Sequence, residues 1–362
     1  MKAAVLHEVG SPLTIEQVKI DKPKGHEVLI RTGAVGVCHS DLHFIDGLYP
    51  YPLPTVPGHE SAGIVEAVGP EVRTVKPGDH VITCLSAFCG HCAHCVTGHL
   101  SLCSGAETRR RKGEEPRITI AEKSSVQFLN LSSFAEQMLI HENACVSVTR
   151  DIPFDRAALI GCAVMTGFGA VNQTAGVRAG ETVCVIGCGG VGLSAINGAA
   201  IAGAGRIIAV DRVASKLDLA KAFGATDIVD ASQVDPVEVV RDLTQGGVDH
   251  AFEAIGLKPT AEQAFSMLAR GGTATVIGMI PRGTMVQIDG SELLGEKRLQ
   301  GSMMGSNRFP VDMPRLVDFY LRGLLKLDDL ISQRLPLEKI NEAVAELRTG
   351  RLARSVLVFD HE

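Results

Sequence analysis

The segment TVCVIGCGGVGLSAINGAAIAG, residues 182–203, decides the fold of this 362-residue chain. It opens with a short β-prone run, passes through a glycine-rich turn and continues as an apolar stretch of helical length. Gly187, Gly189 and Gly192 match the pattern G-x-G-x-x-G, and Asp211 follows Gly192 after 19 residues, at the end of the next predicted strand. A glycine turn between strand and helix with an acidic residue at this spacing is typical of a dinucleotide-binding unit.

The chemistry of this turn predicts NAD as the cofactor. Glycines let backbone N–H groups approach a pyrophosphate, whose charge the amino end of a helix stabilises. Asp211 would accept hydrogen bonds from ribose hydroxyls and repel a 2′-phosphate, which favours NAD over NADP. Arg212 and Lys216 are candidate contacts, although Arg212 is more simply a solvated charge and Lys216 is equally well an exposed lysine. A purely structural glycine turn is the alternative for the whole motif.

The sequence around this segment alternates strand and helix patterns from about Ala179 to Met304, which predicts an α/β fold with a doubly wound parallel sheet. Residues 182–205 carry no formal charge and are long enough to cross a bilayer. Seven glycines interrupt them, so we interpret the stretch as a buried strand, a turn and a core helix.

The flanking regions have a different texture. Residues 1–155 are rich in short alternating runs separated by turn signals, which predicts a β-rich domain. After residue 304 we expect helices at about Met313–Arg322 and Leu337–Arg348 and a final strand in ARSVLVFD. That strand is expected to fold back onto the first domain and make it discontinuous.

Composition excludes several classes of protein. A chain that is 45% hydrophobic and 21% charged is globular, and its length suggests two domains. The net charge of −6 argues against a surface that coats nucleic acid or an anionic membrane. The first residues contain no apolar stretch of the length of a signal peptide, so we expect a cytoplasmic protein.

The cysteines are unevenly placed, with five of the ten between Cys84 and Cys103. Four of them follow the pattern C-x2-C-x2-C-x7-C: Cys89, Cys92, Cys95 and Cys103. Four thiolates in so short a loop can surround one tetrahedral zinc ion in a closed, structural site. An iron–sulfur cluster uses similar spacings, and disulfides are the remaining alternative, which a reducing compartment disfavours.

Several motifs together resemble the zinc-dependent medium-chain alcohol dehydrogenases, with the liver-type branch the nearest, over essentially the whole chain. They include CHSDLH, PGHESAGIVEAVG, the four-cysteine segment, LIGCAVMTGFGA and LPLEKINEAVAELRTGRLARSVLVF. The resemblance implies a GroES-like catalytic domain of residues 1–163 and 302–362, with a structural zinc lobe at 84–105. It also implies a Rossmann NAD-binding domain of residues 164–301.

The resemblance assigns a second zinc ion to three residues that no local spacing connects, Cys38, His59 and Cys162. These ligands would leave a fourth position open for alcohol or water, as catalytic zinc requires. Asp41 would accept the other ring N–H of His59 and fix its tautomer, and Glu60 would be a further carboxylate beside the metal.

The resemblance also implies a proton relay and further cofactor contacts. Ser40 would take the alcohol proton and pass it through the nicotinamide ribose to His43 and solvent. His39 stands where relatives often carry an arginine against the pyrophosphate. Thr166, Val191 and Arg354 match other cofactor-contacting positions.

The implied reaction is reversible hydride transfer between NAD(H) and a primary alcohol or aldehyde that is aliphatic, allylic or aromatic. The implied substrate pocket is lined by Tyr49, Leu85, Phe128 and Leu129. Because the loop 107–127 contains the basic run Arg109–Lys112, a thiol-conjugated formaldehyde dehydrogenase is the alternative enzyme. A non-catalytic member of the fold is a further alternative. We expect a homodimer or homotetramer, with the segment Gly295–Met304 near a subunit edge.

Overall fold

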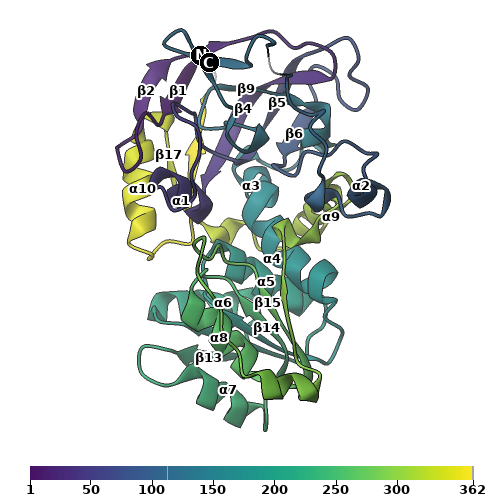
Figure 1. Cartoon of the computed structure of the whole chain (residues 1–362), viewed down its shortest axis with the longest axis vertical. Helices are drawn as coiled ribbons and strands as arrows, with labels where there is room; N and C mark the ends of the chain where they lie inside the picture. The colour runs from purple at the N-terminus through teal and green to yellow at the C-terminus, as the bar shows by residue number, and fades with distance from the viewer. Residues whose placement is uncertain (112, 361–362) are drawn as a thin grey trace. The chain divides into compact units, whose positions relative to one another are not determined.

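The structure, a computed structural model, describes residues 1–111 and 113–360. It divides into two compact units, drawn together in Figure 1. Unit 1 contains Met1–Cys162 and Arg308–Glu362, and unit 2 contains Ala163–Asn307. Unit 1 is therefore discontinuous in sequence.

Unit 2 is built on a parallel six-stranded sheet in the order β13-β12-β11-β14-β15-β16. Its strands are β11 (Thr182–Ile186), β12 (Arg206–Asp211), β13 (Asp227–Asp230), β14 (Val248–Glu253), β15 (Leu268–Val276) and β16 (Arg298–Gly301). The strand order reverses direction between β11 and β14, and ligands of such sheets bind beyond the carboxyl ends of the strands at this point. The predicted doubly wound sheet is confirmed.

The helices of unit 2 follow the predicted alternation. They are α5 (Gly190–Ile201), α6 (Ala214–Phe223), α7 (Pro236–Leu243), α8 (Lys258–Ser266) and the 3-10 segment η6 (Gly290–Gly295). Helix α5 is buried along most of its length, which explains why its sequence is apolar on every side rather than amphipathic. The uncharged stretch 182–205 is therefore a strand and a core helix, as predicted.

Sequence analysis missed a long helical run, Phe154–Ala175, which is apolar enough to cross a membrane. It consists of α3 (Phe154–Leu159), the π-helical η4 (Ile160–Val164), α4 (Met165–Gly169) and the π-helical η5 (Ala170–Ala175). In its most apolar 18-residue window, 83% is buried inside the protein, so the run is a core helix. A Cβ on Gly167 would lie 2.2 Å from the Val191 carbonyl oxygen, so glycine there lets α4 pack closely on α5.

Unit 1 is built on a seven-stranded sheet in the order β10-β6-β5-β4-β18-β17, with β9 also paired to β4. Its strands are β4 (Glu27–Val37), β5 (Glu60–Val68), β6 (His80–Thr83), β9 (Gln137–His141), β10 (Cys145–Val148), β17 (Ile331–Leu335) and β18 (Arg354–Val358). Strand β18 pairs antiparallel with β4, with Val356 opposite Gly36. The predicted return of the final strand to the first domain is confirmed.

Smaller elements complete unit 1. Two further sheets contain β1 (Lys2–Val5) with β2 (Thr14–Gln17), and β3 (Lys19–Ile20) with β7 (Ile118–Ile120) and β8 (Lys123–Ser125). Its other helices include α1 (His39–Ile45), α2 (Ala93–Val96), α9 (Phe309–Leu321) and α10 (Ile340–Arg348). Apolar residues of β1, β4, α1 and α10 share one core. Helix α1 is thus anchored beside the carboxyl end of β4, where the site described below begins.

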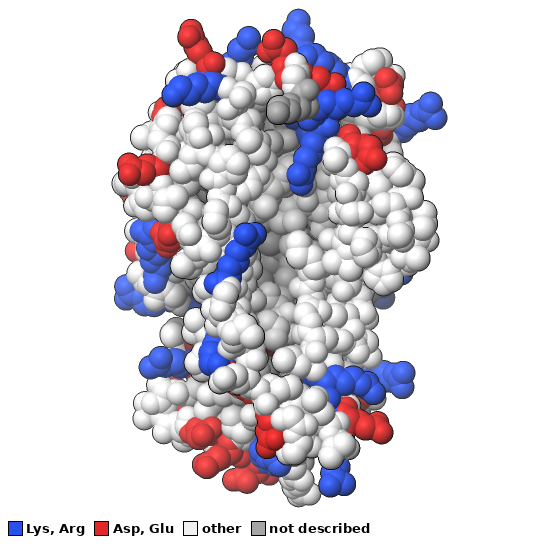
Figure 2. Space-filling model, viewed as in Figure 1, with Lys and Arg blue, Asp and Glu red and all other residues white. Residues whose placement is uncertain are grey.

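The surface carries charges of both signs. Figure 2 shows Lys and Arg interspersed with Asp and Glu, separated by broad uncharged areas. This pattern agrees with the small net charge of −6 and offers no continuous basic surface on the face shown for a nucleic acid.

Candidate functional site: a buried Cys-His-Cys cluster and a dinucleotide turn

Three residues distant in sequence meet inside unit 1. Cys38 follows β4 and caps α1, His59 precedes β5, and Cys162 lies in the π-helical segment η4. All three side chains are buried, and one ligand atom from each lies within 4.8 Å of the others. The structure therefore brings together the three predicted zinc ligands that no sequence spacing connects.

Asp41 fixes the orientation of His59. Its Oδ1 lies 2.9 Å from the His59 Nδ1, and its Oδ2 accepts a 3.0 Å hydrogen bond from the Cys38 backbone N–H. Donation by Nδ1 leaves Nε2 as the free imidazole nitrogen, and Nε2 lies 3.3 Å from the Cys162 Sγ. Asp41 thus holds one ligand and the backbone of another, as a carboxylate that supports a metal site does.

Two charged residues are buried against this cluster. Arg354 Nη2 lies 3.5 Å from the Cys38 Sγ, and its Nε forms a 3.3 Å ion pair with Glu60. Burial raises the pKa of Glu60 to about 7, although the charge of Arg354 opposes this shift. A hydrogen bond from Cys162 lowers the pKa of Cys38 well below its ordinary value, and Arg354 acts in the same direction. The site therefore favours a thiolate at Cys38.

The donor set fits zinc. Two cysteine sulfurs and one imidazole nitrogen form the ligand set of catalytic zinc in alcohol dehydrogenase chemistry, with a fourth position for a small oxygen ligand. The buried Asp41 supplies the hydrogen bond that a metal-bound histidine needs on its second nitrogen. Burying ionisable groups costs free energy unless they are paired or bind a metal. A bound metal ion would account for two thiols and an imidazole being buried together beside a buried arginine.

The proposed relay residues lie on α1, one turn apart. Ser40 Oγ lies 3.7 Å from the Cys38 Sγ, and the half-buried His43 ring packs edge-on against Tyr49 with 6.0 Å between ring centroids. Burial lowers the pKa of His43, which favours the neutral form of its imidazole. His39, at the first position of α1, is exposed. The roles of these residues stay predictions.

The four-cysteine segment forms a second cluster. Its sulfurs are separated by 3.9 Å (Cys89–Cys95), 3.5 Å (Cys92–Cys95) and 4.0 Å (Cys92–Cys103). Four sulfurs at about 2.3 Å from one tetrahedral ion lie roughly 3.8 Å apart, whereas a disulfide joins two sulfurs at about 2 Å. All ten cysteines are unpaired. The geometry fits one zinc ion and excludes the disulfide alternative.

Backbone hydrogen bonds make one thiol of this cluster more acidic, which favours the thiolate form that binds a metal. Hydrogen bonds from the backbone of Ser104 and Cys95 lower the pKa of Cys92 to about 5. Burial acts in the opposite direction on Cys95 and raises its pKa to about 12. His91 is exposed and paired with Glu107 at 3.1 Å, so it stands outside the set of four sulfurs.

The dinucleotide turn lies at the carboxyl end of β11 in unit 2. Gly187 has φ of +97°, which favours glycine, and its N–H donates to the Val210 carbonyl at 2.8 Å. A Cβ on Gly192 would lie 1.7 Å from the Gly187 carbonyl oxygen, whereas a Cβ on Gly189 would meet no atom within 4 Å. Gly192 therefore permits the turn, and Gly189 leaves open space before the amino end of α5. This arrangement suits a pyrophosphate.

Asp211 is held at the edge of this turn. Its Oδ2 accepts a 2.7 Å hydrogen bond from the Cys188 N–H, and its Oδ1 accepts from the Arg212 and Val213 N–H groups at 2.7 and 3.0 Å. The carboxylate is thus fixed where the ribose of a dinucleotide is expected. The Arg212 side chain is exposed, and Lys216 and Val191 are partly exposed. Thr166 lies in α4, with its hydroxyl 3.5 Å from the Met304 sulfur.

Sequence analysis missed two aromatic residues beside the metal cluster. Phe44 and Tyr51 join Phe128 in edge-to-face contacts, with centroids 4.9 Å apart for Phe44–Phe128 and 5.1 Å for Tyr51–Phe128. Phe128 in turn lies 6.3 Å from the His59 ring. Tyr49 contacts Phe44 at 5.9 Å. The run FIDGLYPYPLP carried the signal, since three of its aromatic residues fall within eight positions.

The other predicted pocket residues lie next to this aromatic group. The Leu129 N–H donates to the Tyr51 hydroxyl at 3.3 Å, and the Leu85 carbonyl accepts a 3.0 Å hydrogen bond from Asn130. The structure therefore brings Tyr49, Phe128 and Leu129 into one neighbourhood.

The arginines of loop 107–127 are mostly engaged within unit 1. Arg110 forms ion pairs of 2.5 Å with both Asp21 and Glu27, and Arg117 pairs with Glu27 at 2.8 Å. Arg109 donates to Asn130 at 3.1 Å. Lys112 lies outside the described residues. Among the described basic residues of the run, Arg109 and Arg111 have exposed side chains for which no ion pair is found.

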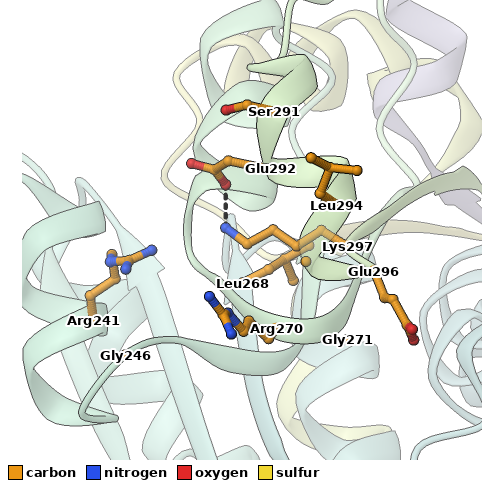
Figure 3. A pocket seen from close by; sticks show the side chains of 11 residues that line it. Arg241, Gly246, Leu268, Arg270, Gly271, Ser291, Glu292, Leu294, Glu296 and Lys297 are labelled. Carbon is orange, nitrogen blue, oxygen red and sulfur yellow. Dashed lines mark hydrogen bonds and ion pairs between the residues drawn. The ribbon is translucent and has the colours of Figure 1, made fainter.

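A hollow of about 740 Å³ in unit 2 lies away from the dinucleotide turn (Figure 3). It is lined by the first residues of β15, by Gly246 before β14 and by η6, so it is at the amino ends of the strands. Two of its charged side chains are engaged, since Lys297 pairs with Glu292 and Arg241 donates to the Ser266 carbonyl at 3.1 Å. We assign it no role in the reaction.

Comparisons with known proteins agree with this site. Residues 24–150 match the alcohol dehydrogenase GroES-like domain, and residues 190–322 match the zinc-binding dehydrogenase family. The chain is 38% identical to a probable S-(hydroxymethyl)glutathione dehydrogenase of Schizosaccharomyces pombe, and the alignment covers 98% of this chain and 96% of that protein. It is 39% identical to an NDMA-dependent alcohol dehydrogenase of Amycolatopsis methanolica, with 99% and 98% covered.

A solved structure is similar over the same length. The benzyl alcohol dehydrogenase of Acinetobacter calcoaceticus is 36% identical, has a TM-score of 0.93 and covers 99% of both chains. The predicted GroES-like and Rossmann folds are confirmed.

Proposed function

This chain belongs to the zinc-dependent alcohol dehydrogenase family, and from that premise we propose that it transfers hydride reversibly between a primary alcohol or aldehyde and NAD(H). The observation that carries the proposal is the buried convergence of Cys38, His59 and Cys162. The dinucleotide turn with its fixed Asp211 supports NAD as the cofactor. The four-cysteine cluster supports a second, structural zinc ion in each chain.

In the proposed mechanism Cys38, His59 and Cys162 would hold the catalytic metal. Zinc, when bound there, is a Lewis acid that makes an alcohol hydroxyl more acidic. Asp41 keeps the Nδ1 proton on His59, so that Nε2 is the coordinating nitrogen. Arg354 and Glu60 balance the charge around Cys38.

The hydroxyl proton leaves through residues of α1. Ser40 is placed beside Cys38 and is the first acceptor, and His43 is the group that releases the proton to solvent. Removing the proton would let the alcohol carbon give up hydride, and a nicotinamide dinucleotide, when bound, would supply the hydride acceptor. The turn of Gly187, Gly189 and Gly192 would bind the pyrophosphate, and Asp211 would bind the ribose.

We propose further cofactor contacts from His39, Thr166, Val191 and Arg354, with Arg212 and Lys216 near the ribose. The exposed position of His39 at the start of α1 is compatible with a contact to the pyrophosphate. Arg354 contacts Cys38 through its Nη2 and Glu60 through its Nε. A contact to the cofactor would therefore use its third guanidinium nitrogen, Nη1.

An uncharged alcohol suits the walls of the site better than an anionic thiol adduct. The fully buried Phe128 ring lies 6.3 Å from the His59 ring, and the partly exposed rings of Phe44 and Tyr49 extend this aromatic group and offer apolar contact. Arg110 and Arg117 are committed to Glu27, so they are not available to bind a carboxylate of a substrate. This distribution favours a benzylic, allylic or aliphatic alcohol.

The thiol-adduct reaction is the second candidate, because relatives at 38% identity include an S-(hydroxymethyl)glutathione dehydrogenase and Arg111 stays exposed. Absorbance of reduced nicotinamide at steady state distinguishes the two. We expect kcat/KM at least tenfold higher with benzyl alcohol than with S-hydroxymethylglutathione, and higher with NAD than with NADP. The opposite substrate ranking would favour the second candidate, and no turnover with either would refute the proposal.

We propose a cytoplasmic enzyme with catalytic residues 1–163 and 302–362 and a nucleotide domain of residues 164–301. The ten unpaired cysteines support a reducing location.

We also propose that the enzyme is a homodimer, or a tetramer of such dimers. Strand β16 pairs only with β15 on the described edge of its sheet, and Leu294 nearby is 92% exposed. An open edge beside an exposed leucine suits pairing with a second copy. Light scattering after gel filtration tests this, since a wild-type monomer at micromolar concentration would exclude it.

A further inference from the structure

A series of hydrogen bonds runs inside unit 1 from a buried carboxylate toward the aromatic group beside His59. Glu27 accepts a 2.8 Å hydrogen bond from the Arg117 Nε. The Nη1 of the same guanidinium donates to the Gln127 Oε1 at 2.8 Å. The amide nitrogen of Gln127 donates to the carbonyls of Leu131 and Leu139 at 3.2 and 2.7 Å. Every polar atom of the Gln127 side chain is thus used.

Gln127 also connects to the aromatic group through its backbone. The Tyr51 hydroxyl donates to the Gln127 carbonyl at 2.8 Å and accepts from the Leu129 N–H at 3.3 Å. The Tyr51 ring packs on Phe128, whose ring lies 6.3 Å from that of His59. Gln127 therefore lies one residue before a ring that contacts a metal ligand.

The turn that follows Gln127 is strained. Leu129, Asn130 and Ser132 all have positive φ, at 46°, 65° and 56°. A bulky leucine in this left-handed region is unfavourable by about 1 kcal/mol or more and persists only where surrounding contacts determine the conformation. Those contacts come from Gln127 and Tyr51 on one side, and from the Ser132 hydroxyl, which accepts a 2.7 Å hydrogen bond from the Phe128 N–H.

We propose that Gln127, oriented by Arg117, is a positioning residue that holds the strained turn 128–132, so that the fully buried Phe128 ring supports the partly exposed Leu129 as a fixed apolar wall. This inference rests on the proposed function and adds to it a preference among primary alcohols. A fixed wall next to the metal cluster favours a flat ring-bearing primary alcohol, because an apolar surface that is already ordered gains contact area with a ring at little cost in conformational entropy. A small alcohol such as ethanol does not reach the wall and gains nothing.

The same geometry gives the arginines of the loop 107–127 a role. Arg117 is 7% exposed, and besides Glu27 and Gln127 it donates to the Thr108 carbonyl at 2.8 Å. The guanidinium therefore links both ends of the loop to the start of β4. Its charge is used to position the loop and is not offered to a substrate.

Two variants test the proposal, with a matched control in the same loop. Gln127→Ala removes the side-chain hydrogen bonds and leaves the Glu27–Arg117 pair intact, and Tyr51→Phe removes the hydroxyl and keeps the ring. Arg111→Gln is the control, because its side chain is exposed. For both test variants we expect KM for benzyl alcohol to rise about tenfold while kcat changes less than about twofold. For ethanol we expect both constants to stay within about twofold, as in the control.

A spectroscopic measurement separates positioning from general damage. The protein has no tryptophan and three tyrosines, so its near-ultraviolet circular dichroism includes a strong contribution from Tyr51. Gln127→Ala should change this signal while the thermal midpoint falls by only a few degrees. Equal losses with ethanol and benzyl alcohol, or an unchanged spectrum with unchanged KM, would overturn the proposal. If the wild type oxidises neither alcohol, the proposed function fails, and the spectrum alone then decides whether Gln127 positions the turn.

Discussion

Asp211 is held in one orientation by backbone groups of the dinucleotide turn and of the residues that follow it. Its two carboxylate oxygens accept three backbone hydrogen bonds, from Cys188, Arg212 and Val213. These contacts fix a negative charge that, under the proposed function, would repel the 2′-phosphate of NADP. The sequence predicted this residue because its position relative to the glycine turn is local information.

Replacing Asp211 should relax the choice of cofactor. Asp211→Asn keeps one acceptor oxygen and removes the charge, so we expect the ratio of kcat/KM for NAD over NADP to fall about tenfold, which is about 1.4 kcal/mol. Asp218→Asn on α6 is the control, since that carboxylate is 73% exposed. A ratio that changes equally in both variants would contradict the role of Asp211.

His141 should make the stability of unit 1 depend on pH. Burial, together with the charges of Arg117 and His26, lowers its pKa to about 4, and its Nδ1 accepts a hydrogen bond from the Asn143 N–H at 3.0 Å. The unfolded chain takes up this proton near pH 6.5, whereas the folded chain does so only near pH 4. The free energy of unfolding is therefore unaffected by His141 above about pH 6.5, and it decreases as the pH falls from 6.5 toward 4.

The effect can be measured by denaturant unfolding at pH 7 and pH 5. The wild type should lose about 1 kcal/mol more than His141→Gln between these values, after an allowance for the partial exposure of the ring. The same loss in both proteins would show that another group controls this range of pH.

At the scale of elements, the strand–turn–helix of residues 182–203 was predictable because each part follows from adjacent residues. The helical run Phe154–Ala175 was not, because it contains three glycines and several β-branched residues and its helicity depends on burial. The aromatic group around Phe128 was predictable only in part, since Phe44 and Tyr51 lie more than 70 residues from Phe128 in the chain.

Two glycines of the turn should respond differently to the same substitution. Gly192→Ala places a Cβ 1.7 Å from the Gly187 carbonyl oxygen, so we expect loss of NAD binding together with destabilisation of unit 2 by about 2 kcal/mol or more. Gly189→Ala meets no protein atom within 4 Å, so we expect normal stability and weaker NAD binding, because the methyl group occupies the space of the pyrophosphate.

Calorimetric titration with NAD and thermal unfolding distinguish these outcomes. A Gly189→Ala protein that binds NAD as tightly as the wild type would contradict the placement of the pyrophosphate at this turn.

At the scale of the whole molecule, the sequence predicted the folds of the two domains and the return of the final strand to the first domain. Both predictions follow from hydrophobic periodicity and the order of elements along the chain. It did not by itself predict the catalytic cluster. Cys38, His59 and Cys162 come from three elements that only the tertiary fold of unit 1 brings together, and the resemblance to a family supplied what spacing could not. The role of the loop 107–127 was likewise hidden, because the partner of Arg117 is Glu27, 90 residues away.

The most direct test of the account is the zinc content of purified wild type and Cys38→Ser, measured by mass spectrometry of the metal alongside alcohol oxidation. We predict two zinc ions per wild-type chain, and one in the variant, with the fold kept by the four-cysteine cluster and oxidation reduced at least a thousandfold. A variant that retains both ions, or that still oxidises alcohol at the wild-type rate, would show that Cys38, His59 and Cys162 do not form the catalytic centre.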